Sequence, residues 1–250
     1  MYRDDFNFLT DFGLASDAVV INQADFCGDT NLELDGHTVL VHTSTARGLS
    51  ASRNKAIELA SADICVITDD DVILAPDYAT MISDAYGRHP EADIIAFQVS
   101  RTGTERAKDF SQMGRRLTFL GAMKVSSVEI TFRREAVRTS GLSFDEAFGS
   151  GSPHSMGEES IFLFDALRKG LRIRYEPVVI GMTHMGKSSW FDGYSEKYFR
   201  DRGAVFKRMA PRLTWLLVIQ FAVRKHSLFA SRISVGGAIR LMLEGARSYR

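Results

Sequence analysis

The sequence is poor in cysteine and lacks any long apolar run. Its two cysteines, Cys27 and Cys65, lie far apart, and Cys65 falls within an apolar stretch, so we expect a small buried thiol in a reducing, cytoplasmic setting rather than a disulfide. The longest apolar run, residues 213–223, is too short to span a bilayer. The first residues, MYRDDFNF, have neither the basic region nor the apolar core of a signal peptide, so none is expected.

The chain also lacks net charge, although its charges are unevenly distributed. It has 31 Lys or Arg and 31 Asp or Glu in 250 residues. Residues 200–250 hold eleven Lys or Arg against Asp201 and Glu244, a net charge of +9, which leaves −9 on residues 1–199. We therefore predict one large domain at 1–189, followed by a basic and mostly helical extension at 190–250.

One acidic triplet stands out from this composition. In ADICVITDDDVILAPDY, residues 62–78, an apolar and β-favouring run leads directly into Asp69, Asp70 and Asp71. This pattern predicts a buried strand that ends in a polar loop, and ligands bind at that end of the strands in an open α/β sheet. Three adjacent carboxylates repel one another unless a cation or hydrogen bonds offset them. The triplet is therefore either a site for a divalent metal that holds a phosphate or a solvated acidic turn.

The remaining pattern predicts an α/β fold. Residues 37–42, 48–60 and the strand before the triplet form a βαβ-like unit, which implies parallel pairing. Residues 100–121 are polar and unpatterned, as expected of a long loop or lid, and residues 141–157 form a loop rich in Gly and Ser. Further strands are expected at 17–25, 92–99, 126–132 and 171–184, and further helices at 78–88, 133–139 and 158–169.

Six short segments occur in a familiar order. They are GLSASRNKAI, the DDD strand end, RREAV, GLSFDEAFG, GEES and a later TH. Their order and spacing resemble family 2 glycosyltransferases of the GT-A fold over about residues 17–200. The resemblance implies a mixed, mainly parallel sheet flanked by helices, with a C-terminal helical extension.

The resemblance also implies a reaction. The protein would be an inverting transferase that uses a nucleotide-diphosphate sugar, UDP-linked in this interpretation, with Mn or Mg. The acceptor would be a hydroxyl of a glycan or lipid-linked molecule in cell-surface polysaccharide synthesis, and no nucleic acid would be bound.

The same resemblance assigns roles to the acidic triplet and to a histidine. Asp71 resembles the metal-binding aspartate of the family, and Asp69 and Asp70 resemble the carboxylates that touch the ribose or assist the metal. His184 resembles the histidine that helps to hold the metal and the diphosphate. The alternative for His184 is an ordinary structural histidine.

Arg53 and Asn54 lie near the start of a predicted helix. Free backbone N–H groups and a permanently charged guanidinium favour an anion there, so by resemblance the two residues help to bind the nucleotide or to order its site. The alternative is a solvated first turn. It is the weaker interpretation, because Arg is not the charge preferred at that end of a helix.

Glu158 and Glu159 begin the helix that follows the Gly- and Ser-rich loop. Glu159 stands where the family has the aspartate of its GED motif, so it would remove the proton from the acceptor hydroxyl, and we favour it over Glu158. The alternative is that both carboxylates simply complement the helix dipole. The change from Asp to Glu lengthens the side chain and leaves the choice between the two open.

The chain departs from the family at its beginning. Members usually start with a strand and loop of the kind VSVIIPTYNR. This chain has no such strand, and MYRDDFNFL resembles only the loop and helix that follow it. We expect that the gene model starts late or that another segment fills the gap, and that upstream residues would restore stability or activity. By the same resemblance, the residues that would contact the nucleotide base lie on the next strand. They are Asn22, Gln23 and Asp25.

The basic C-terminal region permits two interpretations. Its interleaved aromatic residues, among them Trp190, Phe191, Trp215 and Phe221, are typical of a helix on an anionic membrane surface, which would place the enzyme on the inner face of the plasma membrane. A helical hairpin packed on the domain would explain the same residues.

Three other functions compete with the transferase. A phosphatase of the haloacid dehalogenase type also needs DxD after a strand, but at its first strand. A nucleotidyltransferase needs a Gly-rich, Lys-bearing loop near the amino terminus, which the sequence lacks. A non-catalytic, truncated nucleotide-sugar-binding remnant would explain the missing strand.

Overall fold

The computed structural model describes residues 6, 8–102, 110–184 and 193–249. The chain divides into two compact units, and each is described by itself. Unit 1 comprises Met1–Arg47, Ala51–Phe144 and Phe162–Gly186, and unit 2 comprises Gly48–Ser50, Asp145–Ile161 and Lys187–Arg250. The predicted domain boundary between residues 189 and 190 lies outside the described residues.

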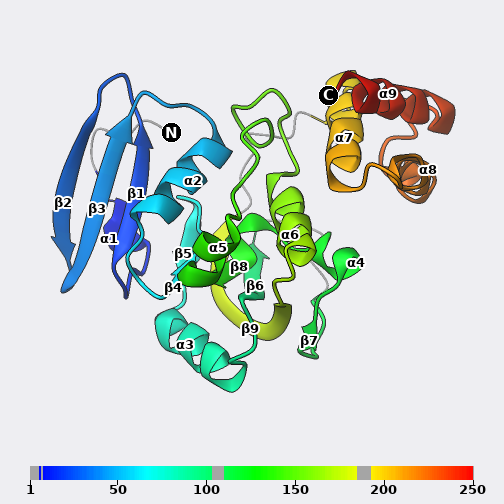
Figure 1. Ribbon diagram of the computed structural model, residues 1–250. Helices are drawn as coiled ribbons and strands as arrows, with labels where there is room; N and C mark the ends of the chain where they lie inside the picture. Colours follow the sequence, from blue (N-terminus) through cyan, green and yellow to red (C-terminus); the bar gives the residue numbers. More distant parts are fainter. Residues whose placement is uncertain (1–5, 7, 103–109, 185–192, 250) are drawn as a thin grey trace. The chain divides into compact units, whose positions relative to one another are not determined.

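Three strands of unit 1 form a small sheet of their own (Figure 1). Strand β1 (Ala18–Gln23) pairs in parallel with β3 (His37–Ser44), and β2 (Gly28–Leu34) pairs with β3 in antiparallel fashion. The β2–β3 hairpin turns at Asp35 and Gly36, whose φ values of 49° and 81° both lie in the left-handed region. An Asp-Gly pair is the preferred sequence for such a turn.

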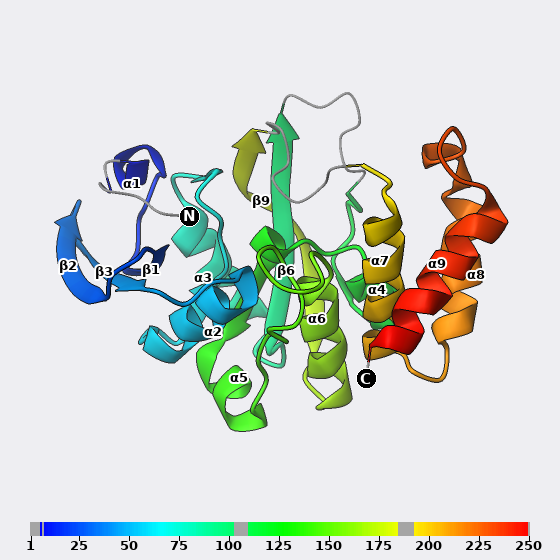
Figure 2. The same ribbon diagram turned by 90° about the horizontal axis from the view of Figure 1, so that it is seen from above.

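The other six strands of unit 1 form a second sheet, in the order β4-β8-β6-β9-β5, with β7 paired to β9. Its central strands β6 and β9 are long, neighbouring and parallel (Figure 2). All its other pairings among the described strands are antiparallel. The strands are β4 (Ile64–Val66), β5 (Val72–Leu74), β6 (Ile94–Thr102), β7 (Arg115–Arg116), β8 (Ile130–Arg133) and β9 (Ile173–His184).

This topology confirms a mixed α/β fold and corrects one prediction about pairing. The strand at 37–42 and the strand before the triplet do not pair in parallel, because β3 and β4 belong to different sheets and β4 pairs with β8. Among the described strands, antiparallel pairings outnumber parallel ones. Neither β1 nor β4 has a second strand neighbour among these strands.

The helices largely follow the predicted positions. Two expectations are wrong. Residues 100–121 are not one unpatterned loop, because β6 extends to Thr102 and residues 110–124 include β7 and α4. The strand expected at 126–132 begins as the 3-10 turn η1. The elements are α1 (Phe8–Asp11), α2 (Leu49–Leu59), α3 (Tyr78–Arg88), α4 (Phe119–Ala122), η1 (Ser127–Glu129), α5 (Arg134–Ser140) and α6 (Glu158–Arg168).

The main core of unit 1 lies where α3 packs against the second sheet. Ile95 and Phe97 of β6 are fully buried there, together with Tyr86 of α3. The Tyr86 hydroxyl accepts from the Ile95 amide at 3.1 Å and lies 3.0 Å from the Thr131 hydroxyl. Burial raises the pKa of this phenol, so it stays neutral and can serve as a hydrogen-bonding group inside the core.

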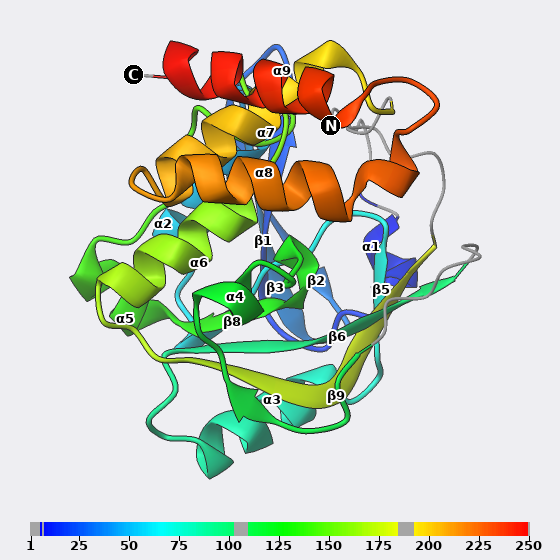
Figure 3. The same ribbon diagram turned by 90° about the vertical axis from the view of Figure 1, so that its right-hand side faces the viewer.

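Three helices, α7 (Glu196–Met209), α8 (Thr214–Arg224) and α9 (Val235–Ser248), lie side by side in unit 2 (Figure 3). A 3-10 turn, η2 (His226–Leu228), follows α8. The hydroxyls of Ser195 and Ser234 cap α7 and α9 by accepting amide hydrogen bonds. Trp190 and Phe191 lie outside the described residues.

None of the described helices is long and apolar enough to cross a membrane.

The α7–α9 contact depends on glycine and generates a first prediction. A Cβ on Gly203 would overlap the carbonyl oxygen of Met242, and one on Gly245 would overlap that of Arg200. Gly203→Ala and Gly245→Ala should each lower the free energy of unfolding by about 1–3 kcal/mol, because the two backbones must separate. Chemical denaturation followed by circular dichroism measures this loss.

Gly236→Ala is the matched control in α9, because a Cβ there meets no atom within 4 Å. It should be neutral or stabilise by up to about 1 kcal/mol, as expected of alanine in a helix. Equal effects at Gly203 and Gly236 would contradict the close backbone contact.

Candidate functional site

The acidic triplet lies in a turn between β4 and β5, both in unit 1. After β4, the Ile67 amide still donates to the Ile130 carbonyl at 3.0 Å, and the chain then turns so that the Val72 amide donates to the Asp69 carbonyl at 3.2 Å. Asp69 is half-buried, whereas Asp70 and Asp71 are exposed. The predicted strand end is confirmed, and two of its three carboxylates are accessible to a ligand.

Arg53 offsets part of the negative charge of the triplet. This α2 side chain is only 7% exposed, and its guanidinium Nη2 donates to Asp69 Oδ1 at 3.0 Å. Its guanidinium carbon lies 5.5 Å from the centre of the Phe144 ring. A buried guanidinium needs an anionic partner, so the solvated first turn considered for Arg53 is wrong.

Asn54 holds the chain segment whose ring covers Arg53. Its side-chain amide accepts from the Phe144 backbone N–H at 2.8 Å and donates to the Phe144 carbonyl at 3.0 Å. The Asn54 side-chain amide thus satisfies both the N–H and the C=O of Phe144, as a neighbouring strand would, and fixes Phe144 against α2. Asn54 therefore orders the surroundings of the Arg53–Asp69 pair.

Asp71 lies at the end of the β5–β9 pair. Its Oδ2 accepts from the Thr183 hydroxyl at 3.2 Å. Val72 pairs with Thr183 in the antiparallel register, so the next positions along the two strands are Asp71 and His184. The backbone thus brings the two predicted metal-ligand positions to one end of this strand pair.

The donor set of the triplet fits Mg²⁺ or Mn²⁺ in one specific way. The described side chains contain no group of three or more His, Cys, Asp or Glu that could hold a metal ion. Mg²⁺ in nucleotide-dependent enzymes is, however, usually held by one or two carboxylates plus the phosphates of the substrate. The exposed Asp70 and Asp71 suit such a partial set, whereas Asp69 is engaged by Arg53.

The predicted nucleotide-reading residues differ in accessibility. Asn22 is buried and donates to the Thr43 hydroxyl at 3.4 Å. Gln23 donates to the Ser52 hydroxyl at 2.8 Å, while the fully exposed Asp25 accepts from Arg47 at 2.6 Å. Of these, Asp25 is the side chain most accessible to a ligand.

Glu158 and Glu159 belong to unit 2, at the start of α6. Glu158 is 7% exposed and packs beneath Gly149, which has a φ of 107° and lacks the Cβ that would crowd it. Glu159 is half-buried and more accessible. This difference favours Glu159 as the group that can reach a substrate.

The loop before these glutamates is fixed to α7 by a residue that sequence reasoning did not single out. Asp201, only 4% exposed, accepts from the Ser155 amide at 3.1 Å and from the Ser155 hydroxyl at 2.9 Å, and lies 3.2 Å from His154 Nδ1. Lys197 also donates to it. The only signal in the sequence was its isolation, since Asp201 and Glu244 are the two acidic residues among residues 200–250.

The electrostatics of Asp201 follow from these contacts. Burial by itself would raise the pKa of its carboxyl, but hydrogen bonds from His154, Lys197 and Ser155 together outweigh burial and hold the pKa well below its usual range. Asp145, at the other end of the loop, accepts from Arg208 of α7 at 2.7 Å. Helix α7 is thus the support of the loop that leads to Glu158 and Glu159.

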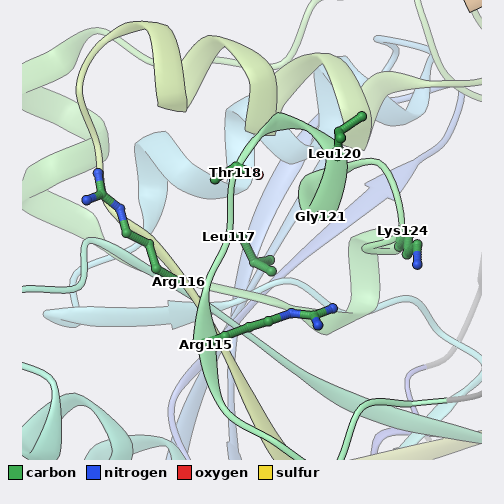
Figure 4. A pocket seen from close by; sticks show the side chains of 7 residues that line it. All are labelled: Arg115, Arg116, Leu117, Thr118, Leu120, Gly121 and Lys124. Atoms are coloured by element: carbon green, nitrogen blue, oxygen red, sulfur yellow. The ribbon is translucent and has the colours of Figure 1, made fainter.

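A pocket of about 280 Å³ lies elsewhere in unit 1 and contains none of the predicted site residues. Figure 4 shows Arg115 and Arg116 of β7 pointing in opposite directions, so their charges do not converge on one ligand. Its lining residues are Arg115, Arg116, Leu117, Thr118, Leu120, Gly121 and Lys124.

Solved structures with the same architecture support the GT-A fold. S. aureus TarS 1-349 in complex with UDP-GlcNAc matches with a TM-score of 0.64 and 13% identity, over 97% of this chain and 78% of that chain. The same TarS segment in complex with UDP has a TM-score of 0.61 and 13% identity, over 97% and 77% of the two chains. At this identity the likeness establishes the fold.

The sequence itself establishes the family. Residues 23–150, just over half of the 250 residues, match the family described as glycosyl transferase family 2, and the chain belongs to that family. No curated protein sequence matches the chain. The protein is therefore a transferase, and the phosphatase and nucleotidyltransferase alternatives lose their support.

Asp201 generates a second prediction. Asp201→Asn removes the charge that Lys197 and the 154–155 segment require, so it should lower the free energy of unfolding at pH 7 by about 3 kcal/mol. A carboxyl whose pKa is lowered in the folded state stabilises above its unfolded pKa of about 3.9 and loses that contribution as the pH falls. The difference between wild type and variant should therefore persist at pH 5 and shrink below about pH 4.

Urea unfolding at several pH values measures this difference. Asp84→Asn in α3 is the matched control, because Asp84 is exposed and forms no hydrogen bond or ion pair with the described residues. Its effect should stay within about 0.5 kcal/mol at every pH. A pH-independent effect of Asp201→Asn would contradict the assigned role of its charge.

Proposed function

We propose that this protein is an inverting glycosyltransferase that moves a sugar from a UDP-linked donor to a hydroxyl of a glycan or lipid-linked acceptor. The proposal extends to cell-surface polysaccharide synthesis at the inner face of the plasma membrane. The observation that carries it is the turn at Asp69–Asp71 in a family 2 chain, where one carboxylate is neutralised by Arg53 and two stay exposed. The TarS structures that share the fold were solved with UDP-GlcNAc and with UDP, which supports a UDP donor.

Each side chain has a definite part in this proposal. Asp71, with Asp70 and the His184 position, would hold Mn²⁺ or Mg²⁺ against the donor diphosphate, and the bound ion would stabilise the negative charge of the leaving group. Arg53 and Asn54 order the site on the α2 side. Asp25 is the proposed nucleotide contact, because it is exposed whereas Asn22 is buried.

Glu159 is the proposed general base. Its carboxylate accepts the proton of the acceptor hydroxyl as the oxygen attacks the anomeric carbon, the bond from that carbon to the diphosphate breaks, and the nucleoside diphosphate leaves from the opposite face. The configuration at the carbon inverts because one displacement occurs. Glu159 needs only to reach the hydroxyl, because oxocarbenium character in the sugar supplies much of the reactivity.

Turnover of a panel of UDP-sugars, with and without Mn²⁺ or Mg²⁺, tests the proposed activity. We expect slow metal-dependent hydrolysis of one donor in the absence of acceptor. No turnover and no donor binding under any condition would favour the non-catalytic remnant.

A third prediction concerns Asp71. Asp71→Asn keeps an acceptor for the Thr183 hydroxyl but removes the charge, so metal-dependent turnover should fall at least about 100-fold with unchanged stability. Asp77→Asn is the matched control, since Asp77 precedes α3 and its side chain makes no capping hydrogen bond. Undiminished turnover in Asp71→Asn would refute the metal assignment.

A fourth prediction separates the two glutamates. Glu159→Gln should lower kcat of transfer by about 10²–10⁴-fold while donor binding, measured by calorimetry, stays unchanged. Glu158→Gln should act mainly on stability, because that carboxylate is buried. The reverse pattern would assign the base to Glu158.

A further inference from the structure

Helix α8 of unit 2 carries apolar side chains on two adjoining faces. One face, with Thr214, Val218 and Ala222, is buried among the helices of the unit. The other face consists of Trp215, Leu216, Ile219 and Val223, which are 43–60% exposed. Their spacing of i, i+1, i+4 and i+8 places all four on one side of a helix. We call these four residues the α8 outer face.

The α8 outer face differs from an ordinary protein surface. Single exposed apolar residues are common, but a contiguous group of large ones on one helix marks a contact surface. Leu213, just before the helix, and Leu228, four residues after its end, are exposed as well. The exposed side of a helix on a soluble protein is normally polar, so the apolar α8 outer face needs a partner.

The charges around α8 indicate what the partner is. Arg212 precedes the helix, and Arg224 and Lys225 are at its end; all three are exposed and make no ion pair with the described residues. Residues 202–243 contain eight Lys or Arg and no Asp or Glu. A partner that is apolar in its centre and negatively charged at its rim matches this pattern, and an anionic bilayer has that profile at its interface.

We infer that the α8 outer face docks on an anionic lipid bilayer, with α8 lying in the plane of the interface. Its 11 residues form a helix of about 16 Å, which is shorter than the hydrocarbon core of roughly 30 Å, so α8 cannot cross it. Trp215 belongs at the interface because its ring is both apolar and able to donate a hydrogen bond. The cations at the two helix ends contact the anionic headgroups.

Vesicle flotation of the full chain tests this inference. We expect the protein to float with vesicles of phosphatidylcholine and phosphatidylglycerol, and about tenfold less with phosphatidylcholine alone or in high salt. Trp215→Ser/Ile219→Ser should reduce flotation at least about tenfold because it removes the apolar anchor. Arg224→Glu/Lys225→Glu should reduce it by a similar factor and abolish its salt dependence.

The matched control is Met113→Ser/Leu120→Ser in unit 1. Both residues are 76% exposed, so this variant removes comparable apolar side chains from another surface. It should float like the wild type, and thermal unfolding should be unchanged in all variants because every substituted position is exposed. Equal losses in the control and the α8 variants would overturn the inference.

Fluorescence gives a second readout. Trp190 and Trp215 are the two tryptophans of the chain, so Trp190→Phe leaves Trp215 as the sole reporter. Its emission should shift to shorter wavelength with anionic vesicles only. An unshifted emission would show that the α8 outer face does not bind a membrane. A dimer that binds no vesicles and that Trp215→Ser/Ile219→Ser dissociates would show the same.

This inference locates the proposed transferase, but its test does not depend on turnover. Vesicle binding is measured without donor or acceptor, and donor hydrolysis by the α8 variants should equal that of the wild type. Loss of hydrolysis with intact vesicle binding would therefore count against the proposed function alone.

Discussion

A buried positive charge organises the acidic site of unit 1. The guanidinium of Arg53 carries a positive charge, so its burial requires an anion close by, and Asp69 supplies it at 3.0 Å. Leaving such a charge unpaired costs about 3–5 kcal/mol, a large fraction of the stability of a domain. Helix α2 and the acidic turn are therefore held together by electrostatics, and the turn is relieved of one of three adjacent negative charges.

The same pair explains the surrounding apolar and amide contacts. The Phe144 ring shields the guanidinium on one side, and Asn54, one residue after Arg53, pins the Phe144 backbone by two hydrogen bonds. Shielding from water strengthens the Arg53–Asp69 attraction, because the effective dielectric constant falls. Two adjacent residues of α2 thus fix the Asp69 side chain and the Phe144 segment, while Asp70 and Asp71 stay exposed for a ligand.

Unit 2 relies on a second buried charge in a comparable way. Asp201 of α7 is surrounded by donors from His154, Ser155 and Lys197, which hold the end of the loop that leads into α6. The basic region is therefore more than a charged extension, because its first helix determines the path of the chain toward Glu158 and Glu159. The +9 net charge of residues 200–250 conceals this role, since the decisive residue is one of the few acids there.

The sequence predicted the elements whose signals are local. The triplet at a strand end, α3 with its stop at His89, and α6 with Gly170 after it all follow from apolar period and capping residues. Strand β2 was missed because its GDTNLEL sequence is mostly exposed and has little to bury, although the Asp-Gly turn after it is a hairpin signal. The β4–β8 pairing joins residues about seventy positions apart, which no local pattern encodes.

A packed helical hairpin and a membrane contact are compatible interpretations of the basic region, because α8 has two apolar faces. Its residues Val218 and Ala222 bury one face in a helical unit, as a packed hairpin requires. Trp215 and Ile219 leave a second apolar face outside that unit, as a membrane contact requires. In the sequence, the residues of both faces form one continuous apolar run, so hydropathy alone does not distinguish the two faces. The separation depends on which side of α8 the neighbouring helices cover, and that is a property of tertiary packing.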